Sequence, residues 1–177
     1  MSDLQPTFMS EAIAQARAAS AAGEVPVGCV IVRDGQVIAR AHNRALTDRD
    51  PTAHCEMLAI REAARVLASE RLVDCDLYVT LEPCTMCAAA ISFARIRRLY
   101  YGAVDPKGGA VESGVRFLAA PTCHHRPEVY GGIGELEAAA LLKDFFRTRR
   151  YDTYRQYLEK KSIGFEGTVS SETSIDL

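Results

Sequence analysis

The chain reads Leu77-Tyr78-Val79-Thr80-Leu81-Glu82-Pro83-Cys84-Thr85-Met86-Cys87 at the point where a strand pattern gives way to a helix pattern. The apolar run indicates a buried strand over Asp76–Leu81, and the proline marks the first turn of a helix over Pro83–Ala94. Another strand is expected at Arg98–Ala103. A strand, a helix and a strand this closely spaced are typical of a parallel crossover. This stretch therefore predicts an α/β fold.

The residues before this stretch predict an antiparallel hairpin. Val27–Arg33 and Gln36–Ala41 are rich in strand-forming residues, and Asp34-Gly35 between them is a strong signal for a two-residue turn. Together with the crossover, the hairpin predicts a mixed sheet in a single three-layer α/β/α domain. Helices are expected at Phe8–Ala22, at His54–Leu67 with Thr52 as the N-cap, and from about Gly134 to Arg149.

Length and composition restrict the classes of protein. The chain has 177 residues, of which 48% are hydrophobic and 25% charged, and these values are typical of one globular domain. No apolar run approaches the roughly 20 residues that span a bilayer, and the N-terminal residues lack the pattern of a secretory signal. We therefore expect a cytoplasmic protein that has no membrane partner. Residues 95–150 carry more Lys and Arg than Asp and Glu, which is compatible with a nucleic-acid partner.

Two short motifs, His54-Cys55-Glu56 and Pro83–Cys87, each open a predicted helix. Cys84 and Cys87 are three residues apart, so both sulfurs face the same side of the helix, whose positive N-terminus favours thiolates. His54 completes a set of three N/S ligands, the number typical of a catalytic zinc site with one open position. Glu56 does not need to bind the metal and is placed to act as general acid and base. This combination is the signature of zinc nucleobase deaminases.

Two other interpretations of the motifs stay open on the residues alone. A structural zinc site needs a fourth ligand, and a thioredoxin-like redox pair leaves His54 and Glu56 without a role. The six cysteines are too few for a disulfide scaffold, and only one pair of them is closely spaced. The candidates for a fourth ligand are Cys123, His124, His125, Cys55, Cys75 and His42.

Further blocks of sequence surround the zinc motifs. They are Glu24-Val25-Pro26-Val27-Gly28, Asn43-Arg44, Asp50-Pro51-Thr52-Ala53-His54, Leu77–Cys84 and Asp144-Phe145-Phe146-Arg147. With these blocks the chain, from about Phe8 to Arg150, closely resembles the bacterial tRNA-specific adenosine deaminases (the TadA family) of the cytidine deaminase-like superfamily. The resemblance implies a cytidine deaminase-like fold with a central mixed five-stranded sheet and a zinc-dependent deaminase domain over residues 1–154. Composition predicts a largely disordered tail over residues 155–177.

The resemblance also implies a reaction, a cofactor and partners. The reaction is hydrolytic deamination of adenosine to inosine at the wobble position of a tRNA anticodon, with a zinc-activated water and Glu56 as the proton shuttle. One Zn²⁺ per subunit is bound by His54, Cys84 and Cys87, in a homodimer whose active sites are completed across the subunit interface. The RNA partner is the anticodon stem-loop. The residues expected to contact the base or the RNA are Val25, Asn43, Cys55, Asp105, Lys107, Phe146, Arg147, Arg149 and Arg150.

Three of these residues need a separate interpretation. Cys55 lies where the family usually has alanine, and we expect its thiol to point away from the metal because successive helical residues diverge in direction. Asn43 has two open interpretations: its amide pairs with the adenine edge, or it makes a local turn after the hairpin. Of Phe145 and Phe146, one is expected to stack on RNA and the other to pack in the core.

Two other functions are weighed against a tRNA deaminase. The first is a zinc-dependent deaminase of a free base or nucleoside, such as guanine, cytosine or cytidine, which shares the metal site. The second is a catalytically silent RNA-binding subunit with a structural zinc, against which Glu56 argues. Faster turnover of small molecules than of RNA favours the first, and a fourth protein ligand supports the second.

Overall fold

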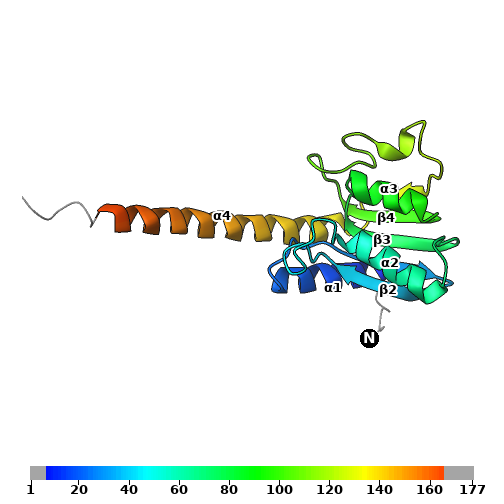
Figure 1. Ribbon diagram of the computed structural model, residues 1–177, viewed down its shortest axis with the longest axis horizontal. Coiled ribbons are helices and arrows are strands. Elements are labelled where there is room, and N and C mark those ends of the chain that lie inside the picture. Colours follow the sequence, from blue (N-terminus) through cyan, green and yellow to red (C-terminus); the bar gives the residue numbers. More distant parts are fainter. Residues whose placement is uncertain (1–6, 166–177) are drawn as a thin grey trace, which may run out of the picture. The chain divides into compact units, whose positions relative to one another are not determined.

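The computed structural model describes residues 7–165, and its central element is a mixed five-stranded sheet (Figure 1). The strand order is β2-β1-β3-β4-β5, in which β1 pairs antiparallel with β2 and β3, whereas β3–β4 and β4–β5 are parallel. The mixed five-stranded sheet predicted from the sequence is therefore confirmed. The elements are α1 (Phe8–Ala21), β1 (Gly28–Arg33), β2 (Gln36–His42), α2 (Cys55–Leu67), β3 (Cys75–Leu81), α3 (Thr85–Phe93), β4 (Arg98–Ala103), the 3₁₀ turn η1 (Phe117–Ala119), β5 (Glu128–Tyr130) and α4 (Glu135–Phe165).

The predicted hairpin between β1 and β2 is confirmed. It turns at Asp34 and Gly35, whose φ angles are 51° and 74°, and positive φ is what a two-residue turn between right-twisted strands requires. Asn43, the residue after β2, returns to the start of β1, where its N–H donates to the carbonyl of Val27 at 3.0 Å. The hairpin thereby places Asn43 beside the Val25–Val27 block.

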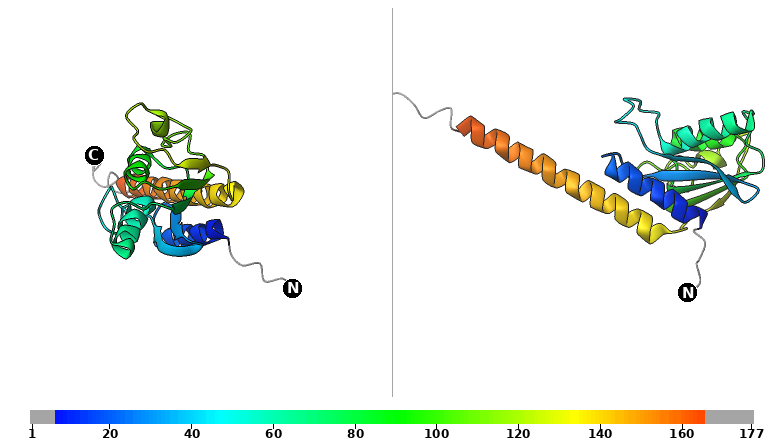
Figure 2. Two further views of the ribbon diagram at one scale, coloured as in Figure 1. Left: turned by 90° about the vertical axis from the view of Figure 1, so that its right-hand side faces the viewer. Right: turned by 90° about the horizontal axis from the view of Figure 1, so that it is seen from below.

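Helices cover both faces of the sheet, with α1 on one face and α2 and α3 on the other (Figure 2). Because side chains alternate along a strand, Ile31, Leu77 and Leu99 point to the larger core beneath α2 and α3. Tyr78 points to the opposite face and packs with Met9 of α1. This is the three-layer α/β/α architecture that the sequence predicts.

Close packing at Gly28 fixes α1 against β1. A Cβ atom on Gly28 would lie 2.3 Å from the backbone nitrogen of Ala16 and 2.4 Å from the carbonyl oxygen of Ala12, and both alanines are fully buried. Glycine on the strand and alanine on the helix therefore allow the two backbones to approach each other. This contact supports the sheet from the face opposite to α2 and α3.

The start of α2 differs from the sequence-based expectation. The N-cap is His54, so the predicted cap at Thr52 is wrong. The Thr52 hydroxyl instead donates to Asp50 Oδ1 at 2.7 Å, and the Thr52 N–H donates to the same oxygen at 2.7 Å. An aspartate two residues upstream competes for the threonine through a local turn.

The C-terminal helix is longer than predicted. α4 continues past Arg149 to Phe165, because neither proline nor glycine interrupts residues 135–163. The chain divides into two compact units, Met1–Lys143 and Asp144–Leu177. The domain boundary at residue 154, expected from the sequence, stays a prediction. The disorder predicted for residues 166–177 lies outside the described residues, whereas residues 155–165 are helical. None of the helices in the described part of the chain combines the length and apolar character of a membrane span.

Candidate metal centre and its pocket

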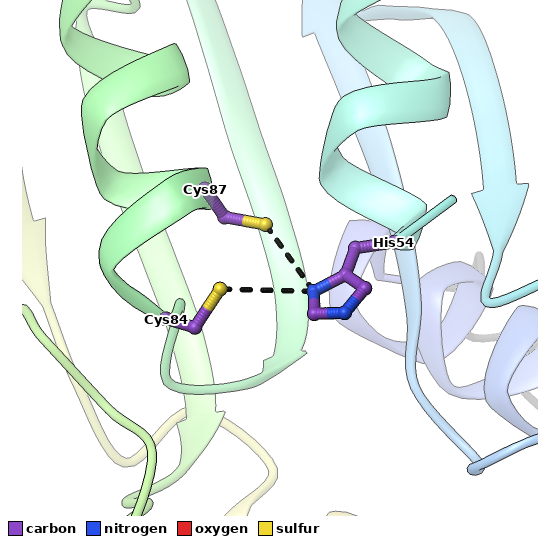
Figure 3. A group of neighbouring side chains, drawn as sticks. All are labelled: His54, Cys84 and Cys87. Atoms are coloured by element: carbon purple, nitrogen blue, oxygen red, sulfur yellow. Dashed lines mark hydrogen bonds between the residues drawn. The ribbon is translucent and has the colours of Figure 1, made fainter. Parts of the chain in front are cut away.

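The three predicted zinc ligands meet at the N-terminal ends of α2 and α3 (Figure 3). Nδ1 of His54 lies 3.7 Å from Sγ of Cys84 and 3.6 Å from Sγ of Cys87. All three ligand atoms lie within 4.8 Å of one another. The fold therefore brings together two motifs that are 30 positions apart in the sequence.

Both helices begin directly at a ligand. His54 and Cys84 are N-cap residues with extended backbones, and their carbonyls accept the N–H groups of Leu58 at 3.1 Å and Ala88 at 2.8 Å. Neither side chain caps its own helix, so the imidazole and the thiol remain available for a common ion. Cys87 follows one turn later on α3 and presents its sulfur to the same point.

The donor set fits a zinc ion. Tetrahedral zinc, at about 2.05 Å from nitrogen and about 2.3 Å from sulfur, places these two ligand atoms about 3.6 Å apart, and the two N···S distances are 3.6 and 3.7 Å. Among residues 7–165, no fourth His, Cys, Asp or Glu joins the group. Three protein ligands leave one coordination position open, which is the pattern of a catalytic site. A structural zinc would lack its fourth ligand here.

The protonation of the two cysteines also favours a cation. The hydrogen bond from Cys87, opposed by burial and assisted by a hydrogen bond from His54, lowers the pKa of Cys84 to about 4. The same shared hydrogen bond, together with burial, raises the pKa of Cys87. At neutral pH the two sulfurs therefore share one proton, and the pair carries a negative charge. A bound dication is attracted to this negative charge. Its binding releases the remaining proton, because zinc binds the thiolate form of cysteine.

Glu56 lies beside the metal ligands but is not one of them. Its side chain is 4% exposed, and burial raises the pKa of the carboxyl group. A raised pKa brings the group nearer to neutral pH, where one carboxyl serves as base and as acid. The buried thiol of Cys55 donates a hydrogen bond to Glu56 Oε2 at 3.2 Å. Cys55 therefore contacts the carboxylate, and it is absent from the group of metal ligands.

A pocket of about 190 Å³ opens onto Glu56 and onto two of the three metal ligands, His54 and Cys84. Three predicted base-contacting residues, Val25, Asn43 and Asp105, line it. Sequence reasoning did not assign Glu82 to the pocket, although the residue lies two positions before the metal ligand Cys84. The full lining is Val25, Val27, Asn43, His54, Glu56, Leu81, Glu82, Cys84 and Asp105.

The side chain of Asn43 bridges two elements of the pocket. Its Oδ1 accepts a hydrogen bond from the backbone N–H of Cys55 at 2.9 Å, which links the end of β2 to the first turn of α2. The Asn43 amide NH₂ is the remaining donor of a side chain that lines the pocket. The residue thus has a positional role in addition to any contact with a base.

Several predicted RNA contacts lie outside the pocket lining. Lys107 is exposed, and its N–H donates to Asp105 Oδ1 at 3.0 Å. Cys55 is buried on α2, and the other residues lie on α4 in the second unit, where Arg149 places its guanidinium 4.9 Å from the centre of the Phe145 ring. Their roles in RNA binding stay predictions. These exposed α4 residues are Phe146, Arg147, Arg149 and Arg150.

Relatives of known function share this sequence over most of its length. The cytidine and deoxycytidylate deaminase zinc-binding region matches residues 2–103. The tRNA-specific adenosine deaminase of Agrobacterium fabrum is 63% identical over 145 residues, which are 82% of this chain and 95% of the relative. The tRNA-specific adenosine deaminase of Bacillus subtilis is 45% identical over 143 residues, which are 81% of this chain and 89% of the relative.

Solved structures give the same grouping. A structure from a study of A-to-I editing by tRNA:A34 deaminases at the wobble position of transfer RNA matches with a TM-score of 0.75 and 64% identity, over 76% of this chain and 98% of that one. A guanine deaminase from Nitrosomonas europaea matches with a TM-score of 0.63 and 26% identity, over 78% and 82% of the two chains. The fold is common to both, whereas the sequence is much nearer to the first. This chain belongs to the tRNA-specific adenosine deaminases, a family of zinc-dependent enzymes with the cytidine deaminase-like fold.

Proposed function

We propose that the protein converts adenosine to inosine at the wobble position of a tRNA anticodon by hydrolytic deamination. The observation that carries the proposal is one pocket lined by the buried carboxyl of Glu56 and by two of the three metal ligands, which as a set leave one coordination position open. The 63% identity to a tRNA-specific adenosine deaminase, over 82% of this chain, supports an RNA substrate. The identity to guanine deaminases is lower, 44% over 56% of this chain and 26% over 78%, which makes a free base the weaker candidate.

Glu56 performs the first half of the reaction. Zinc held by His54, Cys84 and Cys87 supplies Lewis acidity, which lowers the pKa of water from roughly 15.7 to about 7. The Glu56 carboxylate accepts the proton that water loses and delivers it to ring N1 of adenine. Protonation at N1 makes C6 more electrophilic, and hydroxide then adds to C6.

The same carboxyl completes the reaction. After the addition, C6 is tetrahedral and carries a hydroxyl and an amino group. Glu56 takes the hydroxyl proton and donates a proton to the amino group, so that the C–N bond breaks and a C=O bond forms. Adenosine and water give inosine and ammonia, and the carboxylate is regenerated. A residue near the metal but not bound to it is suited to move protons in both directions.

The pocket requires a base that has left its stack, and a single-stranded anticodon loop supplies such a base at low cost. The Asn43 NH₂ group offers a donor to a ring nitrogen of adenine, and Val25 offers an apolar wall. On α4, the exposed Arg147, Arg149 and Arg150 are suited to phosphate contacts, which add affinity without reading the sequence.

We also propose a homodimer that forms through the outer face of α3. Thr85–Phe93 contains no charged residue, yet Phe93 is 72% exposed, and Val66 on α2 is 54% exposed. Exposed apolar area favours association, and Cys87 on the same helix would bring the interface close to the metal centre. We place the enzyme in the cytoplasm, whose reducing conditions suit its six free cysteines.

An editing assay tests the function. Zinc-loaded protein is incubated with anticodon stem-loops that carry adenosine, cytidine or guanosine at the wobble position, and in parallel with free adenosine, guanine and cytosine. We expect inosine only from the wobble-adenosine stem-loops. Release of ammonia from free guanine or cytosine, with no inosine in any RNA, would support the free-base alternative and overturn the proposal.

A further inference from the structure

Glu82 is a buried carboxylate that the proposed chemistry does not use. Its side chain is 2% exposed, and it directly follows β3. Oε1 accepts hydrogen bonds from the backbone N–H groups of Val111 at 3.1 Å, Glu112 at 2.8 Å and Ser113 at 2.8 Å. Oε2 accepts the N–H of Asp105 at 3.0 Å and the hydroxyl of Ser113 at 2.8 Å.

All five donors are uncharged and belong to one segment, Asp105–Ser113. A buried carboxylate is costly unless its lone pairs are filled, and this segment fills them. Burial by itself raises the pKa of Glu82, but the N–H groups of Ser113 and Asp105 more than offset that effect, so the pKa is lowered. The buried carboxylate therefore needs the donors of this segment, and the segment needs the carboxylate as the acceptor of its N–H groups.

The backbone of Asp105–Ser113 is shaped around Glu82. A Cβ atom on Gly109 would lie 2.5 Å from the Glu82 carboxylate, so a larger residue does not fit there without a shift. Gly109 also forms an isolated antiparallel bridge with Cys84, and the N–H of Ala110 donates to the carbonyl of Pro83 at 2.9 Å. The segment thus follows the strand-to-helix junction that carries a metal ligand.

The segment also forms part of the pocket. Asp105, which Oε2 of Glu82 holds through its N–H, lines the pocket together with Glu82 itself. One carboxylate therefore joins a wall of the pocket to the strand that leads into Cys84.

We propose that Glu82 is a positioning residue: it fixes Asp105–Ser113 as one wall of the substrate pocket and thereby sets the affinity for the target nucleotide. This inference rests on the proposed deaminase function. It assigns no contact with the reacting atoms to Glu82, and its effect reaches the substrate through Asp105.

Glu82→Gln is the sharpest variant, because it removes one acceptor and keeps the size of the side chain. The amide carbonyl can replace Oε1 opposite three N–H groups, so the NH₂ group then meets the N–H of Asp105, and two donors face each other. We expect zinc stoichiometry to be unchanged, kcat on a wobble-adenosine stem-loop to stay within about threefold, and KM to rise about tenfold or more. Amide exchange at Asp105 should accelerate.

Asp76→Asn is the matched control. Asp76 is also a buried carboxylate, but it lies near the start of β3, whereas Glu82 follows the end of the strand. Its Oδ1 and Oδ2 each accept from Arg97 at 2.9 Å. This control should lower thermal stability without changing KM or the exchange at Asp105. A purely structural role for Glu82 would give the same pattern as the control, with KM unchanged, and would overturn the inference.

Gly109→Ala tests the same contact from the segment side. The added Cβ should displace the segment from Glu82 and reproduce the rise in KM, and it provides the comparison if Glu82→Gln folds poorly. Unchanged exchange at Asp105 in both variants would also overturn the inference. If wild-type protein edits no RNA, the proposed function fails, whereas the exchange measurement still decides whether Glu82 holds the wall.

Discussion

The chemistry of Glu56 depends on its burial beside the metal ligands. Its carboxyl is positioned by the first turn of α2, which begins directly after His54, and the other acidic residues that line the pocket are Glu82 and Asp105. We expect Glu56→Ala to keep zinc and RNA binding and to lose a factor of about 10² to 10⁴ in kcat. Glu62→Ala, on the same helix and paired with Arg65, is the control and should retain full turnover. Substantial turnover by Glu56→Ala would remove Glu56 from the proton-transfer role.

Cys55 gives a contrasting prediction, because its backbone and its thiol have different partners. The N–H donates to Asn43 and the thiol donates to Glu56. Cys55→Ala keeps the first contact, so we expect kcat within about threefold of wild type and a stability loss of about 1 kcal/mol from the small cavity. Asn43→Ala removes the acceptor of a buried N–H and should cost about 1–3 kcal/mol. Urea unfolding measures both, and a larger loss for Cys55→Ala would contradict this ranking.

The loop between β2 and α2 is held by another buried carboxylate, Glu24. Its oxygens accept the N–H groups of Leu46 at 3.2 Å and Thr47 at 2.6 Å, and it is 1% exposed. Burial raises the pKa of Glu24, but these hydrogen bonds outweigh burial and lower it below its ordinary value of 4.5. A carboxyl whose pKa is lowered on folding contributes stability above its unfolded pKa and loses it as the pH falls through the folded pKa.

This loop predicts a pH dependence of stability. Between pH 7 and about 4.5, wild-type protein should have a higher Tm than Glu24→Gln, since only the carboxylate accepts both N–H groups. Below pH 4.5 the difference should shrink as Glu24 becomes protonated. Thermal unfolding from pH 7 to 3 checks this, with Asp34→Asn, a substitution in the exposed hairpin turn, as control. A Tm difference that stays constant over this range would show that the charge of Glu24 does not hold the loop.

Local patterns predicted the elements well, whereas the hydrogen bonds that Glu82 accepts from a distant segment were not predictable. Asp34-Gly35 and the Cys84–Cys87 spacing are signals within a few residues, and both predictions are confirmed in position. Four of the five partners of Glu82 are backbone N–H groups of a segment 23 to 31 positions away, and a backbone group carries no sequence signal. The cap of α2 was missed for a related reason, since Asp50 and the helix start compete for Thr52 and only the folded chain decides between them.

α4 extends beyond the predicted end at Arg149 to Phe165, and this chain has more residues than the Agrobacterium fabrum relative that it matches. The Agrobacterium fabrum relative corresponds to 145 residues of this chain, and these are 95% of that relative. Every residue that lines the pocket precedes Lys143, where the first compact unit ends. We therefore expect a chain of residues 1–150 to edit a wobble-adenosine stem-loop with kcat/KM within about threefold of the full chain, because it keeps Arg147, Arg149 and Arg150.

A chain of residues 1–143 separates catalysis from RNA binding. It keeps the metal ligands, Glu56 and the pocket, so kcat at saturating RNA should be preserved, while KM should rise because the three arginines of α4 are lost. If each arginine contacts one phosphate of the single-stranded loop, the slope of log affinity against log salt should become shallower by about 2. Binding of both truncated chains, measured between 50 and 200 mM salt, tests this. An unchanged slope for residues 1–143 would exclude the α4 arginines from the RNA interface. If the chain of residues 1–150 already binds RNA more weakly than the full chain, RNA contacts would be assigned to the residues after Arg150.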